Sequence, residues 1–153
     1  MFVVTLLTVV GCGLVGGTFF AFSTFIMRAF ARLPAAQAVA AMQAINVTVV
    51  SPPFMIALFG TGAASLVLAV WSVGRLPATG AVVGLTGGLL YFVGNVVVTI
   101  AFNVPRNNRL ASLRAESDEA AAYWPQYLRV WTAWTHVRTV TALVAAVLLA
   151  HLL

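Results

Sequence analysis

Four long runs of apolar residues, almost free of charge, constrain this chain more than any other feature. They extend from Phe2 to Met27, Phe54 to about Val73, Thr79 to Asn103, and Val130 to Leu153. Each is long enough to cross roughly 30 Å of hydrocarbon, which takes about 20 helical residues. Because a backbone inside a bilayer must satisfy its own hydrogen bonds, each run is predicted to be a helix.

The composition indicates a protein that is embedded in lipid. Hydrophobic residues make up 62% of the 153 residues, and charged residues only 7%, whereas about 25% of residues are charged in soluble domains. So few charges cannot cover a water-facing surface, so most of the exterior must face lipid. We predict an all-α integral membrane four-helix bundle, a single transmembrane domain over residues 1–153.

The segments between the runs differ in polarity. Residues 34–51 are polar but uncharged, and we predict a short helix there, at the membrane interface or stacked on the end of the bundle. Pro105 predicts that the third helix ends at Asn103. The fourth helix is predicted to begin near residues 106–119, pass through Pro125 and project beyond the membrane on one side.

All eight basic residues are arginines, and most flank the apolar runs. This pattern is typical of membrane topology signals and argues against a nucleic-acid partner. The connections after the first and third runs hold five arginines, against one after the second: Arg28, Arg32, Arg106, Arg109 and Arg114, against Arg75. We therefore predict a multi-pass protein of the cell (inner) membrane, with both termini outside and the basic segments in the cytoplasm.

Glycines recur at helical spacing in two of the runs. The letters of Gly11–Gly16 match the dinucleotide fingerprint G-x-G-x-x-G, but no strand precedes them and they fall in mid-membrane. Small residues four apart favour close helix packing instead. This interpretation predicts packing faces at Gly13 and Gly17, and at Gly80, Gly84 and Gly88.

The third run carries polar residues at steps of four: Tyr91, Asn95, Thr99 and Asn103. Residues at i and i+4 share one helical face. Unpaired amides in hydrocarbon cost several kcal/mol, so this face is predicted to point into the bundle. Two roles stay open: hydrogen bonds that join helices, or the wall of a polar pocket.

The fourth run combines aromatic and ionisable residues. Trp124, Trp131 and Arg138 are seven apart, Tyr127 and Trp134 fall on or beside that face, and His136 is displaced around the helix. An ionisable group inside a membrane is a functional candidate by default. Snorkelling of Arg138 and an interfacial belt of tryptophans are the alternatives.

A metal site has little support in the sequence. The two histidines, His136 and His151, are fifteen residues apart, about 22 Å along a helix. The three acids, Glu116, Asp118 and Glu119, cluster in one connection, so no carboxylate is available at mid-membrane for a proton-coupled pump. We predict no metal and no cofactor from these residues.

Four segments resemble the anthrone oxygenase family of small membrane proteins, formerly a domain of unknown function. They are Gly17–Ser23, Ala41–Asn46 followed by Pro53, Asn103–Leu110, and Trp124…Tyr127…Trp131–Thr139. The resemblance spans nearly the whole chain in the family's order. It implies a four-helix membrane bundle and, for some members, oxidation of anthrones to anthraquinones by molecular oxygen. Position 135 is Thr where the family's motif has Asn.

With this resemblance, the residues suggest an oxidoreductase site for a flat apolar aromatic or quinone-type substrate. His136 is the candidate base, and Arg138 and Asn103 complete the predicted catalytic set. The predicted substrate-binding residues are Asn46, Tyr91, Asn95, Trp131 and Trp134. The alternatives are a non-catalytic protein that binds a lipid, quinone or haem, and a partner subunit or homo-oligomer in a membrane complex.

Overall fold

The computed structural model describes residues 1–153 and contains four long helices and one shorter helix, without strands. The first long helix joins α1 (Phe2–Ala21) to α2 (Met27–Phe30), and the shorter helix is α3 (Ala35–Thr48). The second joins α4 (Pro52–Met55) to α5 (Thr61–Val73), the third joins α6 (Thr79–Tyr91) to α7 (Val104–Ala111), and the fourth is α8 (Asp118–Ala150). The predicted all-α four-helix bundle is confirmed.

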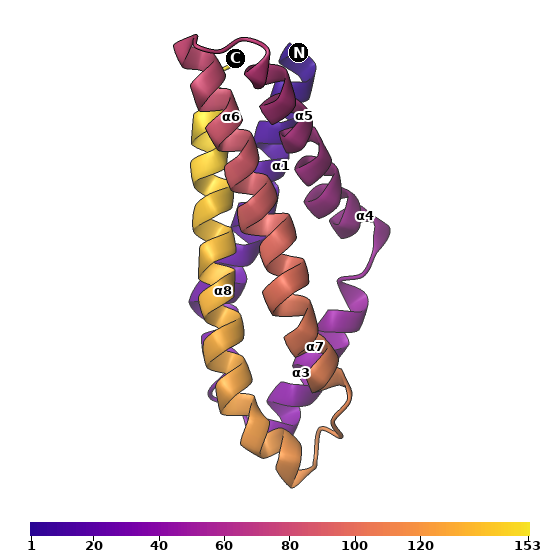
Figure 1. The fold of residues 1–153 in the computed structure, drawn as a ribbon. Coiled ribbons are helices and arrows are strands. Elements are labelled where there is room, and N and C mark those ends of the chain that lie inside the picture. The colour runs from indigo at the N-terminus through magenta and orange to yellow at the C-terminus, as the bar shows by residue number, and fades with distance from the viewer.

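The four long helices run side by side over most of their length (Figure 1). In the upper half, α8 packs against α1 and α6, and α5 packs against α6 and α1. Both termini lie at this upper end (Figure 1). The lower half contains α3, α7 and the first turns of α8, and α3 packs against the other two.

Three of the long helices contain π-helical turns, in which hydrogen bonds link i to i+5 and one residue is gained per turn. These turns are Phe22–Ile26 in the first helix, Ile56–Gly60 in the second, and Phe92–Val97 and Thr99–Asn103 in the third. Such turns occur frequently at functional sites.

The third helix does not end at Asn103, and this prediction was wrong. The helix continues as α7 to Ala111, with Pro105 as the second residue of α7. The π-helical turn just before it has already shifted the hydrogen-bond ladder, so the missing N–H of the proline disturbs a register that is changing anyway. The Arg106 side chain donates a hydrogen bond to the carbonyl of Phe102, one turn earlier in the helix.

The short helix α3 is stacked on the end of the bundle. Ala38, Val39 and Met42 are buried and pack in one cluster with residues of α7 and α8. Gln43 Nε2 donates to the carbonyls of Leu110 and Leu113, at 2.8 and 2.9 Å. These bonds cover the carbonyls at the end of α7 and tie the two helices together.

The glycine prediction is correct for Gly84 and Gly88 and wrong for Gly13, Gly17 and Gly80. A side chain on Gly84 would collide with Ser72, and one on Gly88 with the backbone of Ser65, so α5 and α6 approach closely there. A Cβ built on any of the other three would meet no atom of a neighbouring helix within 4 Å. Spacing alone did not reveal which glycines face a neighbouring helix.

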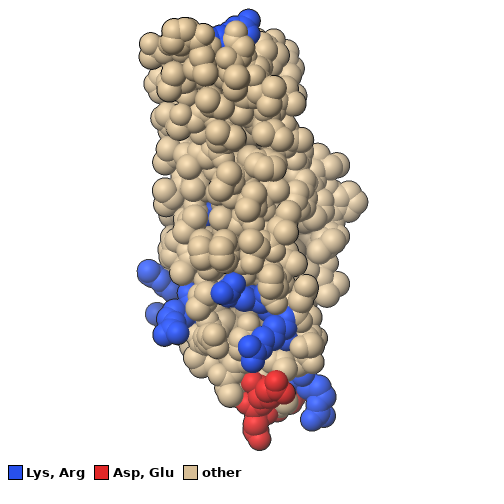
Figure 2. All heavy atoms as spheres, viewed as in Figure 1, with Lys and Arg blue, Asp and Glu red and all other residues tan.

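Each of the four long helices is long and apolar enough to cross a membrane, which indicates a multi-pass membrane protein. In Figure 2, basic side chains form a belt near the lower end and acidic side chains lie at its tip. Another basic group lies at the upper end, where α5 and α6 are joined, and the surface between the two ends is almost uncharged.

Candidate functional site

An apolar cavity of about 160 Å³ lies in the middle of the bundle, next to the connection between α3 and α4. Twelve of its eighteen lining residues are hydrophobic. Aromatic rings contribute from three of the long helices: Phe19, Phe22, Phe54, Phe59 and Trp131. For comparison, an engineered apolar cavity of ~150 Å³ takes up benzene. The cavity therefore suits a flat aromatic group.

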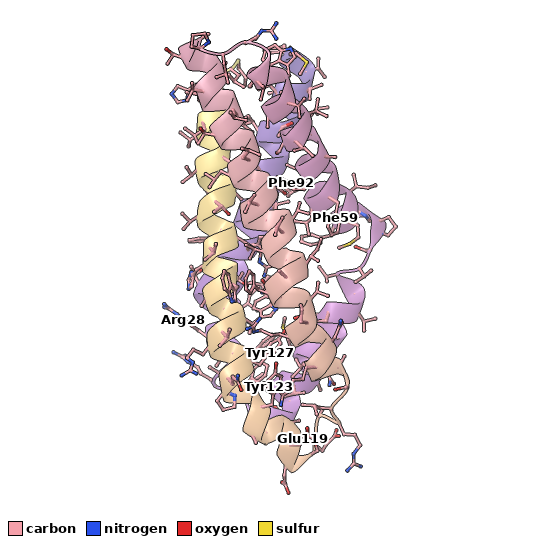
Figure 3. The ribbon with its side chains drawn as sticks, viewed as in Figure 1. Arg28, Phe59, Phe92, Glu119, Tyr123 and Tyr127 are labelled. Atoms are coloured by element: carbon pink, nitrogen blue, oxygen red, sulfur yellow. The ribbon has the colours of Figure 1, made fainter.

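The cavity borders a π-helical turn of each of the first three long helices. Phe22 belongs to the turn in the first helix, Leu58 to that in the second, and Thr99 and Asn103 to that in the third. One side of the cavity reaches the outside of the bundle, because three of its lining residues are exposed: Val50 by 69%, Phe59 by 40% and Val104 by 38%. Figure 3 labels Phe59 near the α4 end of the second helix.

Arg138 is the only charged residue that lines the cavity, and it is only 3% exposed. Its Nη1 donates to Thr99 Oγ1 at 3.3 Å, and its Nη2 to Thr135 Oγ1 at 2.6 Å. The guanidinium carbon lies 3.9 Å from the ring centroid of Phe19 and 5.3 Å from that of Trp131. These contacts hold the cation in place through hydroxyls and π-faces.

No carboxylate balances this buried charge. All three acids of the chain lie in the 116–119 segment, and Asp118 is twenty residues before Arg138 on the same helix, about 30 Å away. A buried cation without a counter-ion is costly. The cavity is therefore suited to an anionic or strongly polarised oxygen from a ligand.

Three buried polar atoms of cavity-lining residues have no hydrogen-bond partner: Asn46 Nδ2, Asn103 Oδ1 and Arg138 Nε. The Nδ2 of Asn103 donates to the carbonyl of Trp131 at 3.4 Å, and this bond identifies the Oδ1 as the unpaired atom of the amide. Buried polar atoms are usually paired. Three unpaired ones around a single cavity indicate a place for a polar group of a bound molecule.

Asn107 is a site residue that the sequence analysis missed. Its Oδ1 accepts hydrogen bonds from Tyr127 Oη and from Trp131 Nε1, both at 2.8 Å, and the residue lines the cavity. Figure 3 shows Tyr127 between α8 and α7. Asn107 is four residues after Asn103, so it continues the polar stripe by one step. A helix that ends at Asn103, as predicted from Pro105, would not carry the stripe on to Asn107.

The polar stripe faces the bundle interior, as predicted, but only its lower half lines the cavity. Tyr91 and Asn95 are fully buried. Tyr91 Oη donates to the carbonyl of Leu58 at 3.2 Å, and Asn95 Nδ2 donates to Thr141 Oγ1 at 3.1 Å. These bonds connect helices, whereas Thr99 and Asn103 are part of the cavity wall.

Two predicted residues on α8 lie outside the cavity. Trp134 stacks on Phe102, with 3.7 Å between ring centroids. His136 is exposed and lies in a separate groove with Arg28 and Arg129. Arg138 is two positions further along α8, which is about 200° around the helix, so His136 and Arg138 face different surroundings. Nowhere in the chain do three His, Cys, Asp or Glu side chains gather at metal-binding distance.

A sequence model of the family described as "Anthrone oxygenase" matches residues 53–148, about two thirds of the chain. The chain belongs to the anthrone oxygenase family. Neither the curated proteins nor the solved structures include a significant match. The family match extends from α4 to α8 and so contains Asn103, Asn107, Trp131 and Arg138. The cavity walls from α1 and α3 lie outside it.

Thr135 lies directly beside the buried cation. Its hydroxyl accepts the hydrogen bond from Arg138 and donates to the carbonyl of Trp131 at 2.8 Å. Thr135 thus links Arg138 to the backbone of α8. Because Thr135 is fully buried and does not line the cavity, its role here is to position Arg138.

Proposed function

We propose that this chain binds a flat, apolar, weakly acidic aromatic ketone of the anthrone type and promotes its oxidation by O₂. The observation that carries the proposal is Arg138, a buried cation without a carboxylate in an aromatic-lined cavity. Loss of a proton from the central CH₂ of such a ketone places negative charge on its carbonyl oxygen. A fixed cation next to that oxygen stabilises the enolate more than the neutral ketone.

The proposed reaction is balanced without a further oxidant. The C–H proton leaves to water, and the enolate carbon then adds O₂ by transfer of an electron and recombination, forming a C–O bond. The resulting peroxide takes up a proton and loses water, as the second C–H bond and the O–O bond break. The CH₂ group is oxidised to C=O, and O₂ is reduced to one water and the new carbonyl oxygen.

The other cavity residues would orient the substrate. The amides of Asn46 and Asn103 have unpaired atoms for the polar edge of the ligand, and Trp131 provides a flat wall that Asn107 holds in place. His136, the candidate base from the sequence, gains no support from the geometry because it lies in another groove. We assign the proton transfer to water rather than to His136.

An apolar substrate would reach the cavity from the lipid, past Val50 and Phe59. For the membrane orientation we retain the cytoplasmic assignment of the basic end. Six of the eight arginines belong to α2, α7, the first half of α8 and the connections next to them, whereas Arg75 follows α5 at the opposite end. This distribution supports outside termini under the positive-inside rule.

The test is oxygen uptake by the purified protein in detergent, with a simple anthrone as substrate. We expect uptake above the spontaneous rate, and a fall of about 10²- to 10³-fold in kcat for Arg138→Gln, the size of effect seen when one oxyanion donor is removed. Arg138→Lys should retain part of the activity, and His136→Ala most of it. Uptake equal to the spontaneous rate, or full activity in Arg138→Gln, would refute the proposal.

A second candidate function is binding of a quinone or another apolar anion without turnover. The observation in its favour is that no Asp, Glu, His or Lys lines the cavity, so the chain provides no ordinary base there. Extraction of the purified protein with organic solvent, followed by absorbance and mass spectrometry, would test it. A stoichiometric quinone with no anthrone-dependent oxygen uptake would favour binding over catalysis.

A further inference from the structure

A second hollow, separate from the cavity, lies on the outer surface between α2 and α8. It has a volume of about 290 Å³, and its polar lining consists mainly of Arg28, Arg129, Thr132 and His136. Figure 3 shows Arg28 on the outer side of the bundle, beside α8. We propose that this groove binds the phosphate group of an anionic phospholipid. This inference does not depend on the proposed oxidation.

The ionisable residues that line the groove are all basic. Two arginines and a histidine line it, and no acidic residue does. The nearest acids along α8, Asp118 and Glu119, are at least ten residues before Arg129, about 15 Å along the helix. Arg28 and Arg129 are both exposed, so their guanidinium groups are free to move onto a phosphate. Paired N–H donors make arginine well suited to phosphate oxygens.

An unpaired hydroxyl lies in the same groove. Thr132 Oγ1 is buried and has no hydrogen-bond partner in the chain. Arg129, Thr132 and His136 are spaced three and four residues apart on α8, so they share one face of the helix. A phosphate held by the two arginines would give Thr132 the acceptor that it lacks. His136 adds a further donor, because a histidine ring carries an N–H in either tautomer.

The surroundings favour a lipid over a free phosphate. Above the groove, toward the upper end, the same face of α8 continues with Val140 and Leu143, which are four and seven residues after His136. Both are exposed, by 59% and 42%. On α1, Phe20 is 51% exposed, and Gly17 is also exposed and contacts no neighbouring helix. A phosphate in the groove would thus leave an acyl chain against an apolar surface.

Basic pockets between transmembrane helices are a known form of headgroup site. This groove also lies in the belt of basic residues near the lower end of the bundle, at the edge of the uncharged surface (Figure 2). A lipid phosphate occupies that level of a bilayer. A bound anionic lipid would thus account for three features at once: the cation cluster, the unpaired hydroxyl and the open apolar surface above them.

The test measures lipid binding by thermal unfolding of the purified protein in a non-ionic detergent. Short-chain phosphatidylglycerol is titrated, with phosphatidylcholine of the same chain length and inorganic phosphate as separate arms. We expect phosphatidylglycerol to raise the Tm in a saturable way and the other two to have little effect. An equal rise with inorganic phosphate alone would overturn the assignment to a lipid, and an equal rise with phosphatidylcholine would overturn the role of charge.

Variants locate the site. Arg28→Gln/Arg129→Gln should weaken phosphatidylglycerol binding about 30-fold. The matched control, Arg32→Gln/Arg114→Gln, removes the same charge from connections outside the groove and should weaken it less than about 3-fold. Thr132→Val keeps the charge and should weaken binding about 5-fold through one lost hydrogen bond. Equal losses in the two double variants would refute the groove as the site.

Discussion

Asn107 Oδ1 accepts hydrogen bonds from Trp131 Nε1 and Tyr127 Oη, and so one amide joins α7 to two aromatic rings of α8. An indole N–H can only donate, so the oxygen of the amide must face Trp131. The orientation of the cavity's largest aromatic wall is therefore set by a residue on a neighbouring helix.

Replacing Asn107 by Leu should disturb substrate binding and stability together. Two buried donors would lose their acceptor, at a cost of about 1–3 kcal/mol each, and the ring of Trp131 would no longer be held. We expect a lower free energy of unfolding and a KM for the anthrone raised about 10-fold. Tyr127→Phe removes one donor and keeps the Trp131 bond, so it should change KM less than twofold.

Widening the side chain at the exposed edge of the cavity should slow substrate entry. Val50 lines the cavity and is 69% exposed, so Val50→Trp can be accommodated without a change in the core. We expect kcat/KM for the anthrone to fall about 10-fold at an unchanged Tm. Val70→Trp is the matched control, because Val70 is 66% exposed on α5 and away from the cavity. Equal rates in the two variants would place the entrance elsewhere.

Asn95 should matter for stability and not for catalysis. Its amide donates to Thr141 Oγ1 and does not line the cavity. Hydrogen bonds between membrane helices contribute about 0.6 kcal/mol on average and up to about 1.7. Asn95→Ala should lower the free energy of unfolding by that order and leave oxygen uptake within twofold. Asn103→Ala, from the same stripe, should instead reduce uptake. A large activity loss in Asn95→Ala would restore its predicted role in substrate binding.

Two glycines should respond in opposite directions to the same substitution. Gly88→Ala would force a methyl group against the backbone of Ser65, and overpacking of this kind typically costs 1–3 kcal/mol. Gly13→Ala meets no atom within 4 Å and should be neutral or stabilising by roughly 0.5–1 kcal/mol, since Ala favours helix over Gly. Unfolding in mixed micelles would measure both. If Gly13→Ala were instead destabilised, Gly13 would have to contact a helix of another chain.

Sequence patterns predicted the architecture better than they predicted the site. Hydropathy and length gave the four spans, because lipid enforces helix on any long apolar run. The seven-residue spacing predicted that Trp131 and Arg138 share one face of α8, and both line the cavity. The spacing of four predicted that the polar stripe faces the bundle interior, and its residues are buried. His136 was chosen for its chemistry although its position around the helix already separated it from Arg138.

The wrong end of the third helix and the omission of Asn107 have one source. Proline rules assume a regular α-helical ladder, and a single sequence carries no clear signal for a π-helical turn. Those rules therefore predict an end at Asn103 and give no reason to place Asn107 on the same helical face. The cavity itself could not be predicted either. Its position depends on the path of the connection between α3 and α4, from Thr48 to Pro52.

Because of the π-helical turns around the cavity, its shape depends on the number of residues in each helix. Each turn contains one residue more than the α-helix would need, and the first three long helices each place such a turn at the cavity. Deleting one residue from the Thr99–Asn103 turn would return it to α-helical hydrogen bonding and remove the local widening beside the cavity, while the helix on both sides keeps its register. A deletion of one codon in this turn would therefore change the shape of the cavity wall without disturbing how the rest of the third helix packs.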